Sequence, residues 1–201
     1  MLKYNKKGGE FMKVTIGVSN HHVHVTSEDL KTLFGEGVEL NAIKPLNQPG
    51  QFAAEEKVTV KTENGELTGL RILGPCRNYT QVEISQTDAR NLKISAPVRC
   101  SGDLEGAAEV EIVGPCGSVR GNFAIIADRH IHVTRSDRER LGLVGVEEVS
   151  VLVSTSKGGV FDHVKVREAE ASYYEMHIDT DDANGFLIDN GMEGEILVDK
   201  K

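Results

Sequence analysis

A short motif occurs twice in this chain and limits how the chain can fold. The first copy reads SNHHVHVT at residues 19–26, and the second reads ADRHIHVT at residues 127–134. In an extended strand, alternate side chains point to the same face. The two histidines of each His-x-His therefore share one face, and the β-branched residues beside them share the other. Each copy predicts a strand with one apolar face against a core and a histidine pair opposite.

Two histidines spaced in this way can hold one metal ion, because imidazole nitrogens are good ligands for zinc and related transition metals. The pairs are His22 with His24 and His130 with His132. One pair alone would be weak evidence, but four of the seven histidines fall in these two matching motifs. The sequence therefore predicts two metal sites, one in each half of the chain.

The likeness between the halves extends further along the chain. VEISQTDA at residues 82–89 aligns with MHIDTDDA at residues 176–183, which places a glutamate of the first half against a histidine of the second. A duplicated unit places equivalent residues at equivalent points. Three protein ligands with an open fourth position are typical of a catalytic metal. The predicted sets are His22, His24 and Glu83 in the first half, and His130, His132 and His177 in the second. His21 and His163 have no such partners and are expected to be ordinary residues.

Alternating apolar residues and frequent turn residues favour short strands over long helices. In each motif the final threonine precedes an aspartate by three residues, which predicts a helix start there, and a further helix is expected at 87–92. Residues 41–56 contain two prolines and are expected to form an irregular connection. The expected strands cover residues 13–19, 57–61, 67–73, 80–85, 108–113, 123–127, 149–154, 160–166 and 174–179. The pattern predicts a mainly β fold with short helices.

The composition excludes several classes of partner. The formal net charge is -8 at pH 7, and aromatic residues make up 5% of the chain. This balance argues against nucleic acid as the general partner. The three cysteines have no Cys-x-x-Cys spacing, as is typical of a reduced cytosolic protein. No stretch approaches the roughly 20 apolar residues needed to cross a bilayer, and residues 1–12 lack a signal-peptide core. We expect a soluble, cytoplasmic protein with no nucleic-acid or membrane partner.

Several blocks in a fixed order make a more specific pattern than any single motif. They read GVSNHHVHV, IKPLNQPGQFAAEE, ILGPCRNYTQVEIS, RCSGDL, DRHIHV and EMHIDTDDAN. From about Lys13 onward the chain resembles the PduL-type phosphotransacylases, also called phosphate propanoyltransferases. The resemblance implies an enzyme that exchanges a short acyl group, propionyl or acetyl, between coenzyme A and phosphate, with a role in propanediol degradation or fermentation.

The resemblance also implies a fold and a cofactor. It implies two small β-barrels capped by short α-helices and internally duplicated, with two divalent metals per chain and zinc as the expected metal. Residues 1–21 and 129–201 are expected to form one barrel, because the N-terminal strand joins the C-terminal half. Residues 22–128 form the other barrel, and the metal and coenzyme A site lies between the two. Cobalt, nickel and iron stay open as alternative metals.

The metal ligands of the family fall on the same six residues that the internal repeat predicts. The remaining roles rest on the resemblance alone. The coenzyme A contacts fall on Val18, Ser19, Asn20, Arg71 and Asn184, and the catalytic, phosphate-binding arginine falls on Arg77. The chain departs from the family at His21, where arginine is frequent, and at Cys100, where aspartate is frequent.

The residues suggest a direct transfer of the acyl group, because no Ser-His-Asp or Cys-His arrangement is evident. Cys76 is the one candidate for a covalent acyl-enzyme. In the family that the chain resembles, microcompartment members carry an N-terminal amphipathic extension, and the dozen residues before the first strand here are short for a stable helix of about 12–15 residues. We therefore expect a cytoplasmic enzyme, with the microcompartment lumen as the alternative, and a homodimer stays open.

Two other functions stay open at this stage. A cupin-like single-metal oxygenase or isomerase would use Glu28 after the first histidine pair, although Glu28 lies in an expected helix start and not on a strand. A non-catalytic metal-binding module is the second alternative. Metal hydrolases of the (β/α)8 type also use His-x-His, but 201 residues with few helices are short for an architecture of about 250 residues.

Overall fold

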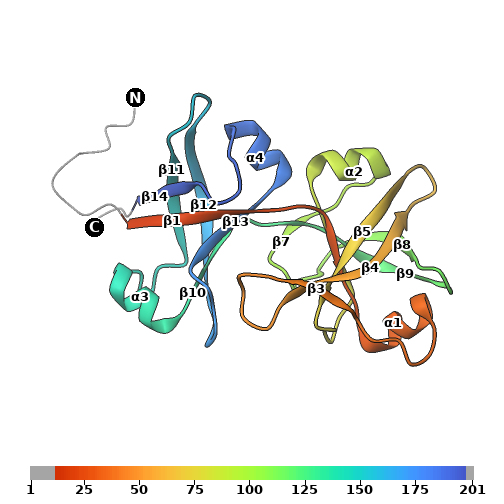
Figure 1. Ribbon diagram of the computed structural model, residues 1–201. Helices are drawn as coiled ribbons and strands as arrows, with labels where there is room; N and C mark the ends of the chain where they lie inside the picture. Colours follow the sequence, from red (N-terminus) through yellow and green to blue (C-terminus); the bar gives the residue numbers. More distant parts are fainter. Residues whose placement is uncertain (1–11, 198–201) are drawn as a thin grey trace.

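The structure is a computed structural model that describes residues 12–197. Within that range the chain forms two closed barrels of six strands each, which lie side by side (Figure 1). The prediction of a mainly β fold with two β-barrels and short helices is confirmed. The expectation about the first dozen residues rests almost entirely on residues 1–11, which lie outside the described range. In residues 12–197, no helix has the length and apolar character that a membrane span requires.

One barrel contains most of the C-terminal half together with the first strand of the chain. Its strands follow the order β1-β13-β10-β12-β11-β14 around the closed ring. Strand β1 pairs with β13 in parallel and with β14 in antiparallel fashion. The elements are β1 (Met12–Ser19), β10 (His130–Val133), α3 (Arg135–Leu141), β11 (Glu148–Val153), β12 (Gly159–Glu168), β13 (Glu175–Asp179), α4 (Thr180–Phe186) and β14 (Glu193–Leu197).

The other barrel contains the middle of the chain. Its ring runs β4-β5-β2-β6-β9-β8 and closes where β8 pairs with β4. Strands β3 and β7 extend the sheet at its two edges. The elements are β2 (His22–His24), α1 (Ser27–Phe34), β3 (Ala42–Pro45), β4 (Phe52–Lys61), β5 (Glu66–Gly74), β6 (Gln81–Ile84), α2 (Gln86–Leu92), β7 (Val98–Arg99), β8 (Ala108–Val113) and β9 (Ser118–Ala127).

Strand pairing follows the same scheme in the two barrels. Strand β2 lies between β5, which is parallel to it, and β6, which is antiparallel. Strand β10 lies between β12 and β13 with the same two orientations. The apolar residues of the motifs behave as predicted, because Val23, Val25, Ile131 and Val133 are fully buried. They belong to two separate cores, one inside each barrel.

The helix starts predicted after the motifs are also present. Thr26 accepts a hydrogen bond from the backbone N–H of Asp29 and caps α1. Thr134 caps α3 through a complete capping box, in which the Asp137 carboxylate also accepts from the Thr134 backbone. A capped helix therefore begins directly after each histidine strand, which is only three or four residues long.

The expectation of an irregular connection at 41–56 is wrong. Strand β3 runs up to Pro45, and β4 begins at Phe52 and continues to Lys61 as a ten-residue barrel strand. Proline is tolerated at the end of β3 because this is an edge strand, where a missing N–H leaves no broken ladder. The connection itself is the shorter stretch 46–51. Strand β14, which closes the C-terminal barrel, is a further strand that the sequence pattern did not predict.

Candidate metal and substrate site

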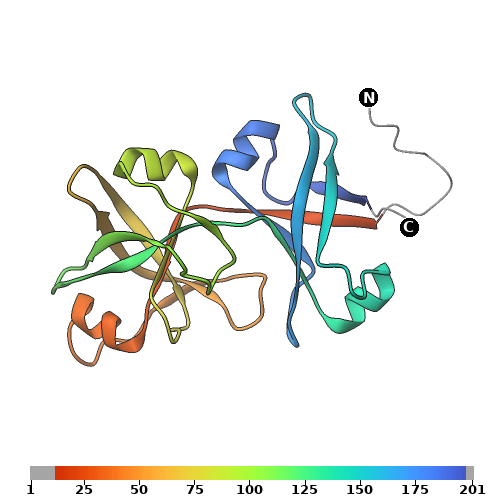
Figure 2. The same ribbon diagram turned by 180° about the vertical axis from the view of Figure 1, so that it is seen from behind.

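Both histidine motifs lie where the chain crosses from one barrel to the other. Strand β1 belongs to the C-terminal barrel and leads directly into β2 of the N-terminal barrel, and β9 leads back into β10 (Figures 1 and 2). Each motif therefore begins at a junction between barrels, and side chains at the two junctions line a common pocket. This crossing explains how two motifs about a hundred residues apart come to share one site.

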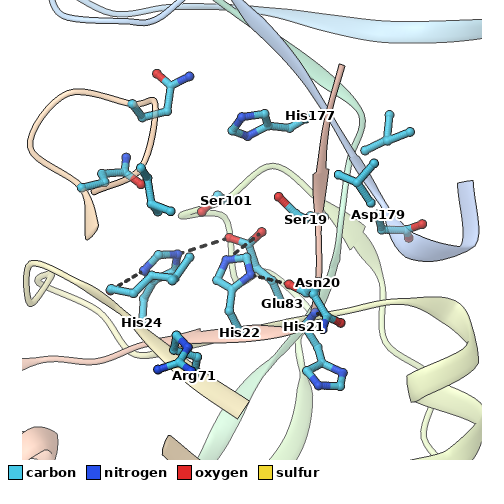
Figure 3. A pocket seen from close by; sticks show the side chains of 18 of the residues that line it. Ser19, Asn20, His21, His22, His24, Arg71, Glu83, Ser101, His177 and Asp179 are labelled. Atoms are coloured by element: carbon cyan, nitrogen blue, oxygen red, sulfur yellow. Dashed lines mark hydrogen bonds and ion pairs between the residues drawn. The ribbon is translucent and has the colours of Figure 1, made fainter. Parts of the chain in front are cut away.

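The first predicted ligand set comes together as expected. His22 and His24 lie on β2, and Glu83 lies directly opposite His22 on β6. The Nε2 atom of His22 is 3.5 Å from Glu83 Oε2, and the Nε2 atom of His24 is 3.7 Å from Glu83 Oε1. Figure 3 shows the Glu83 carboxylate beside the two rings. All three side chains are buried.

The second predicted set has the same arrangement on the other barrel. His130 and His132 lie on β10, and His177 lies directly opposite His130 on β13. The Nε2 atoms of His130 and His132 are 3.0 Å apart. In each set, one potential ligand atom from every residue lies within 4.8 Å of the others. The register His22–Glu83 is thus repeated by His130–His177, so the alignment of the halves holds at the level of strand pairs.

Backbone carbonyls fix which ring nitrogen is available for a metal. The Nδ1 atoms of His22 and His130 lie 2.8 Å from the carbonyl oxygens of Asn20 and Asp128, and His24 Nδ1 lies 3.1 Å from the Leu73 oxygen. A carbonyl only accepts, so each Nδ1 carries the hydrogen and each Nε2 keeps its lone pair. Metal-binding histidines are held in this way. The donor set of nitrogen and carboxylate atoms therefore fits a divalent ion such as zinc.

The pKa shifts in the site keep His24 and His130 neutral and Glu83 ionised, which are the forms that bind metal. Loss of hydration lowers the pKa of His24 to about 3 and that of His130 to about 4, with neighbouring positive groups adding to the effect. Burial also lowers the pKa of His22, but the Glu83 carboxylate outweighs it and the net pKa is raised. Burial raises the pKa of Glu83, but His22 and His24 hold it well below its usual range. Neutral imidazoles and an ionised carboxylate are the metal-binding forms.

The pocket between the barrels has a volume of about 690 Å³ and is lined by all six predicted ligands. The residues that line it also include Val18, Ser19, Asn20, Arg71 and Arg77. Arg71 donates to the carbonyl oxygens of Ala54 and Glu55, which fixes its guanidinium at the wall. Asn184 lies exposed on α4 and is not among the residues that line the pocket, so its contact with coenzyme A stays a prediction.

Arg77 reaches the pocket from the loop between β5 and β6. Its Nη1 atom donates to the Tyr79 hydroxyl at 2.7 Å and to the Ser101 hydroxyl at 3.1 Å. Its backbone N–H donates to the Val25 carbonyl at 2.9 Å, which anchors the loop to the end of β2. Arg167 approaches from β12 and donates to the Ser101 carbonyl at 3.3 Å. Two guanidinium groups therefore meet at Ser101, one from each barrel.

Sequence reasoning missed four polar residues of this pocket region. Gln81 is fully buried and bonds both Glu83 and Ser101. Glu175 is buried beside His177, and Arg167 and Ser101 complete the group. A signal for two of them was present, because Gln81 and Glu175 each precede a predicted ligand by two residues and so share its face of the strand. Ser101 and Arg167 carried no local signal.

The loop 46–51 of the N-terminal barrel lines the pocket and makes hydrogen bonds to the C-terminal barrel. Asn47 Nδ2 donates to Glu175 Oε1 at 2.9 Å. The Gln48 side chain exchanges two hydrogen bonds with the backbone of Tyr173, at 3.0 and 3.1 Å. Gln48 is 5% exposed, so these bonds are sheltered from water. The loop therefore links the two barrels by hydrogen bonds beside the pocket.

Fold and site together define a class of protein: a double β-barrel whose inter-barrel pocket combines two three-residue ligand sets with arginines suited to anionic substrates. A model of the family "Phosphate propanoyltransferase" matches residues 15–189. The chain belongs to the phosphate propanoyltransferase family and is thus an acyltransferase of the phosphotransacylase type. The resemblance drawn from the sequence blocks is confirmed.

Individual relatives match over most of their length. The chain is 48% identical over 180 residues to the phosphate propanoyltransferase of Thermotoga maritima, which covers 89% of this chain and 86% of that protein. It is 46% identical over 184 residues to that of Rhodopseudomonas palustris, covering 91% and 81%. It is 45% identical over 186 residues to that of Rhodobacter capsulatus, covering 92% and 85%.

Membership of this family sets aside the two alternatives left open by the sequence. Glu28, which a cupin-like site would require, is exposed on α1, and Glu83 takes the third position of the first set. A purely metal-binding module does not account for Arg77 and Arg167, which line the same pocket as the ligands.

Proposed function

We propose that this chain interconverts a short-chain acyl-CoA plus phosphate and an acyl phosphate plus coenzyme A, with propionyl-CoA or acetyl-CoA as substrate and two divalent metals, most simply zinc, in the two ligand sets. The observation that carries the proposal is that both sets and Arg77 line one pocket. Relatives that share 45–48% of their residues with it are named for the propanoyl reaction.

Arg77 is the residue we assign to the phosphoryl group. A guanidinium presents two parallel N–H donors that match phosphate oxygens, and this makes arginine the usual choice where a phosphate must be oriented. Tyr79 and Ser101 engage only Nη1 of Arg77. The remaining N–H groups are available to the substrate, so the side chain is oriented and still able to donate.

Coenzyme A is assigned to the wall formed at the end of β1. Val18, Ser19 and Asn20 lie there, and Arg71, which is opposite His22 on β5, can meet a negative charge. When bound, divalent ions in the two sets supply Lewis-acid polarisation of the acyl carbonyl and favour the thiolate form of coenzyme A. The protein residues orient the thiol, the acyl group and the phosphate, and Arg77 neutralises charge on the phosphate.

Direct transfer between the two substrates is the mechanism we favour. Cys76, the candidate for a covalent acyl-enzyme, packs against the apolar core of the N-terminal barrel and is not among the residues that line the pocket. Attack by a protein thiol requires an accessible thiolate at the substrate. Its position therefore supports transfer within a ternary complex.

The proposal is tested by measuring metal content and thiol release together. Purified protein is analysed for metals and then assayed with propionyl-CoA or acetyl-CoA and phosphate, using a thiol reagent to follow free coenzyme A. We expect about two divalent ions per chain and phosphate-dependent thiol release that a chelator abolishes and added zinc restores. Thiol release without phosphate would indicate a hydrolase, and full activity in chelator-treated protein would refute the metal assignment.

The cytoplasmic location belongs to the same proposal, with a microcompartment lumen as the alternative. A reporter fused to residues 1–20 is expected to stay outside microcompartment shells, and recovery of the reporter inside them would favour the alternative. Size measurement in solution decides whether the active form is a homodimer.

A further inference from the structure

Glu175 is a buried carboxylate beside the second ligand set that the mechanism above does not use. It lies on β13, two residues before His177, and pairs across the sheet with His132. Its exposure is 5%. Its Oε2 atom is 2.8 Å from His177 Nε2, and its Oε1 atom accepts from Asn47 Nδ2 at 2.9 Å. Both oxygens therefore have partners, and one partner is a predicted metal ligand.

The equivalent position in the other barrel has the same relation to its ligand. Gln81 lies two residues before Glu83 and pairs across the sheet with His24. Its Nε2 donates to Glu83 Oε1 at 2.6 Å. In one barrel a neutral side chain holds a charged ligand, and in the other a charged side chain holds an imidazole. Each ligand set thus has one partner residue, Gln81 or Glu175, on the same strand face as the ligand it contacts. Each set, counted with its partner, contains one carboxylate.

Gly17 provides the space that this arrangement needs. It is the register partner of His177 on β1, where the other barrel has Ile125 opposite Glu83. A Cβ atom at Gly17 would lie 3.0 Å from Glu175 Cδ and 3.1 Å from His177 Cδ2. Contacts that short would require the carboxylate or the ring to move. Because glycine has no side chain, Glu175 and His177 can pack against β1 at this position.

The same contact shows how the His177 ring is turned. Its Cδ2 and Nε2 atoms form one edge, and this edge faces Gly17 of β1 and the Glu175 carboxylate. The opposite edge, formed by Nδ1 and Cε1, then faces the neighbour on the other side, β10, which carries His130 and His132. The Glu175 carboxylate accepts a hydrogen bond from the Asn47 amide at Oε1, and its other oxygen, Oε2, is the acceptor for the His177 ring nitrogen. The proton of the ring is thus on Nε2.

We propose that Glu175 is a positioning residue for the second metal: it holds the proton of His177 on Nε2 and so presents Nδ1 to the ion. This inference rests on the proposed metal centre. It distinguishes His177 from His22, His24 and His130, which have their Nδ1 atoms on backbone carbonyls and present Nε2. Carboxylate–histidine–metal arrangements of this kind orient the ring and raise its basicity.

The first test reads the tautomer directly in the native protein. Long-range ¹⁵N–¹H NMR spectra of zinc-loaded protein with labelled histidine distinguish a protonated Nε2 from a protonated Nδ1, and the His177 signals are identified by their absence in His177→Gln. We expect His177 to carry its proton on Nε2, while His22, His24 and His130 carry theirs on Nδ1. A proton on Nδ1 of His177 would overturn the inference.

The second test measures metal affinity by competition with a chelator. Losing a partner of a metal-bound histidine typically lowers affinity 10- to 100-fold. We expect Glu175→Ala to lower the affinity of one of two Co²⁺ sites by roughly that factor, Glu175→Gln to have a smaller effect because its amide oxygen still accepts, and Gly17→Ala to resemble Glu175→Ala. The Co²⁺ absorption spectrum of that site should shift with it, which a general loss of stability would not produce.

Controls separate this inference from the proposed function. Glu170→Gln removes an exposed carboxylate of the same barrel and should leave both affinities unchanged. Two ions bound with wild-type affinity and spectrum in a folded Glu175→Ala protein would refute the role of Glu175 and leave the metal centre standing. Failure of the wild-type protein to bind divalent ions would refute both.

Discussion

Replacing Arg77 by lysine preserves the positive charge at the pocket but removes the planar fork. In the structure the Nη1 atom of the guanidinium donates to the Tyr79 and Ser101 hydroxyls, at 2.7 and 3.1 Å. Its other nitrogens are available to donate to a ligand. A lysine carries its three N–H donors on a single Nζ atom, so it keeps the charge but cannot present two parallel donors to the phosphate from a fixed plane. The substitution therefore separates bidentate orientation of phosphate from charge alone.

The magnitude follows from the interactions that are lost. A hydrogen bond to a charged group contributes on the order of 1.5–3 kcal/mol, and about 1.4 kcal/mol corresponds to a factor of ten. We expect kcat/KM for phosphate to fall by roughly 10- to 150-fold in Arg77→Lys. Metal content should stay at two per chain, because Arg77 does not belong to either ligand set. The KM for acyl-CoA should change little, since that substrate is assigned to Arg71 and the end of β1.

The assay is steady-state thiol release with each substrate varied in turn, alongside elemental analysis of the same preparation. Arg120→Lys is the matched control, because Arg120 is an exposed arginine of β9 paired with Glu109 at the surface. An unchanged phosphate dependence combined with weaker acyl-CoA binding would refute the assignment. Arg71 would then become the phosphate residue, and the two anion sites would be reversed.

Three further predictions concern the ligand sets and the mechanism. His132→Ala should reduce metal content from about two ions per chain to about one, whereas the control His163→Ala, which alters an exposed histidine, should keep both; two ions in His132→Ala would remove it from the set. Cys76→Ala should retain most of its turnover, and near-total loss in a folded variant would favour a covalent acyl-enzyme. In chelator-treated protein, the free energy of unfolding should fall as the pH drops from 6.5 to about 4, because His130 has a pKa of about 4 when folded and takes up a proton near its usual 6.5 when unfolded. That difference corresponds to about 3 kcal/mol at most, and a flat stability profile from urea titrations across this range would contradict it.

The two ligand sets could be found in the sequence because they depend on local geometry and on repetition. A strand places residues i and i+2 on one face whatever surrounds it. The two histidines of each His-x-His motif must therefore lie on the same face. The burial of Val23 and Ile131 on the opposite face follows from the same alternation. Glu83 and His177 were found through the repeat, because duplicated units place equivalent residues at equivalent positions.

Sequence patterns were less reliable where a strand departs from clear alternation. Residues 41–56 suggested a connection because of Pro45 and Pro49, yet β4 begins at Phe52. Turn residues mark where a strand is interrupted, but hydrogen bonds to neighbouring strands decide where it starts. Pro45 ends an edge strand, and its position at an edge is a property of the assembled sheet.

What the sequence by itself determined is the content of each half: short strands, capped helices, a histidine pair and a third ligand on a shared strand face. Residue patterns did not determine how the halves meet, which only the family resemblance implied: β1 completes the C-terminal barrel, and both junctions line one pocket. What only the tertiary structure decided is which side chains meet in that pocket. The meeting of Arg77 and Arg167 at Ser101, and of Asn47 with Glu175, depends on segments far apart in the chain. Local periodicity fixes which way a side chain points from its own strand, but its partners across a pocket depend on packing between barrels.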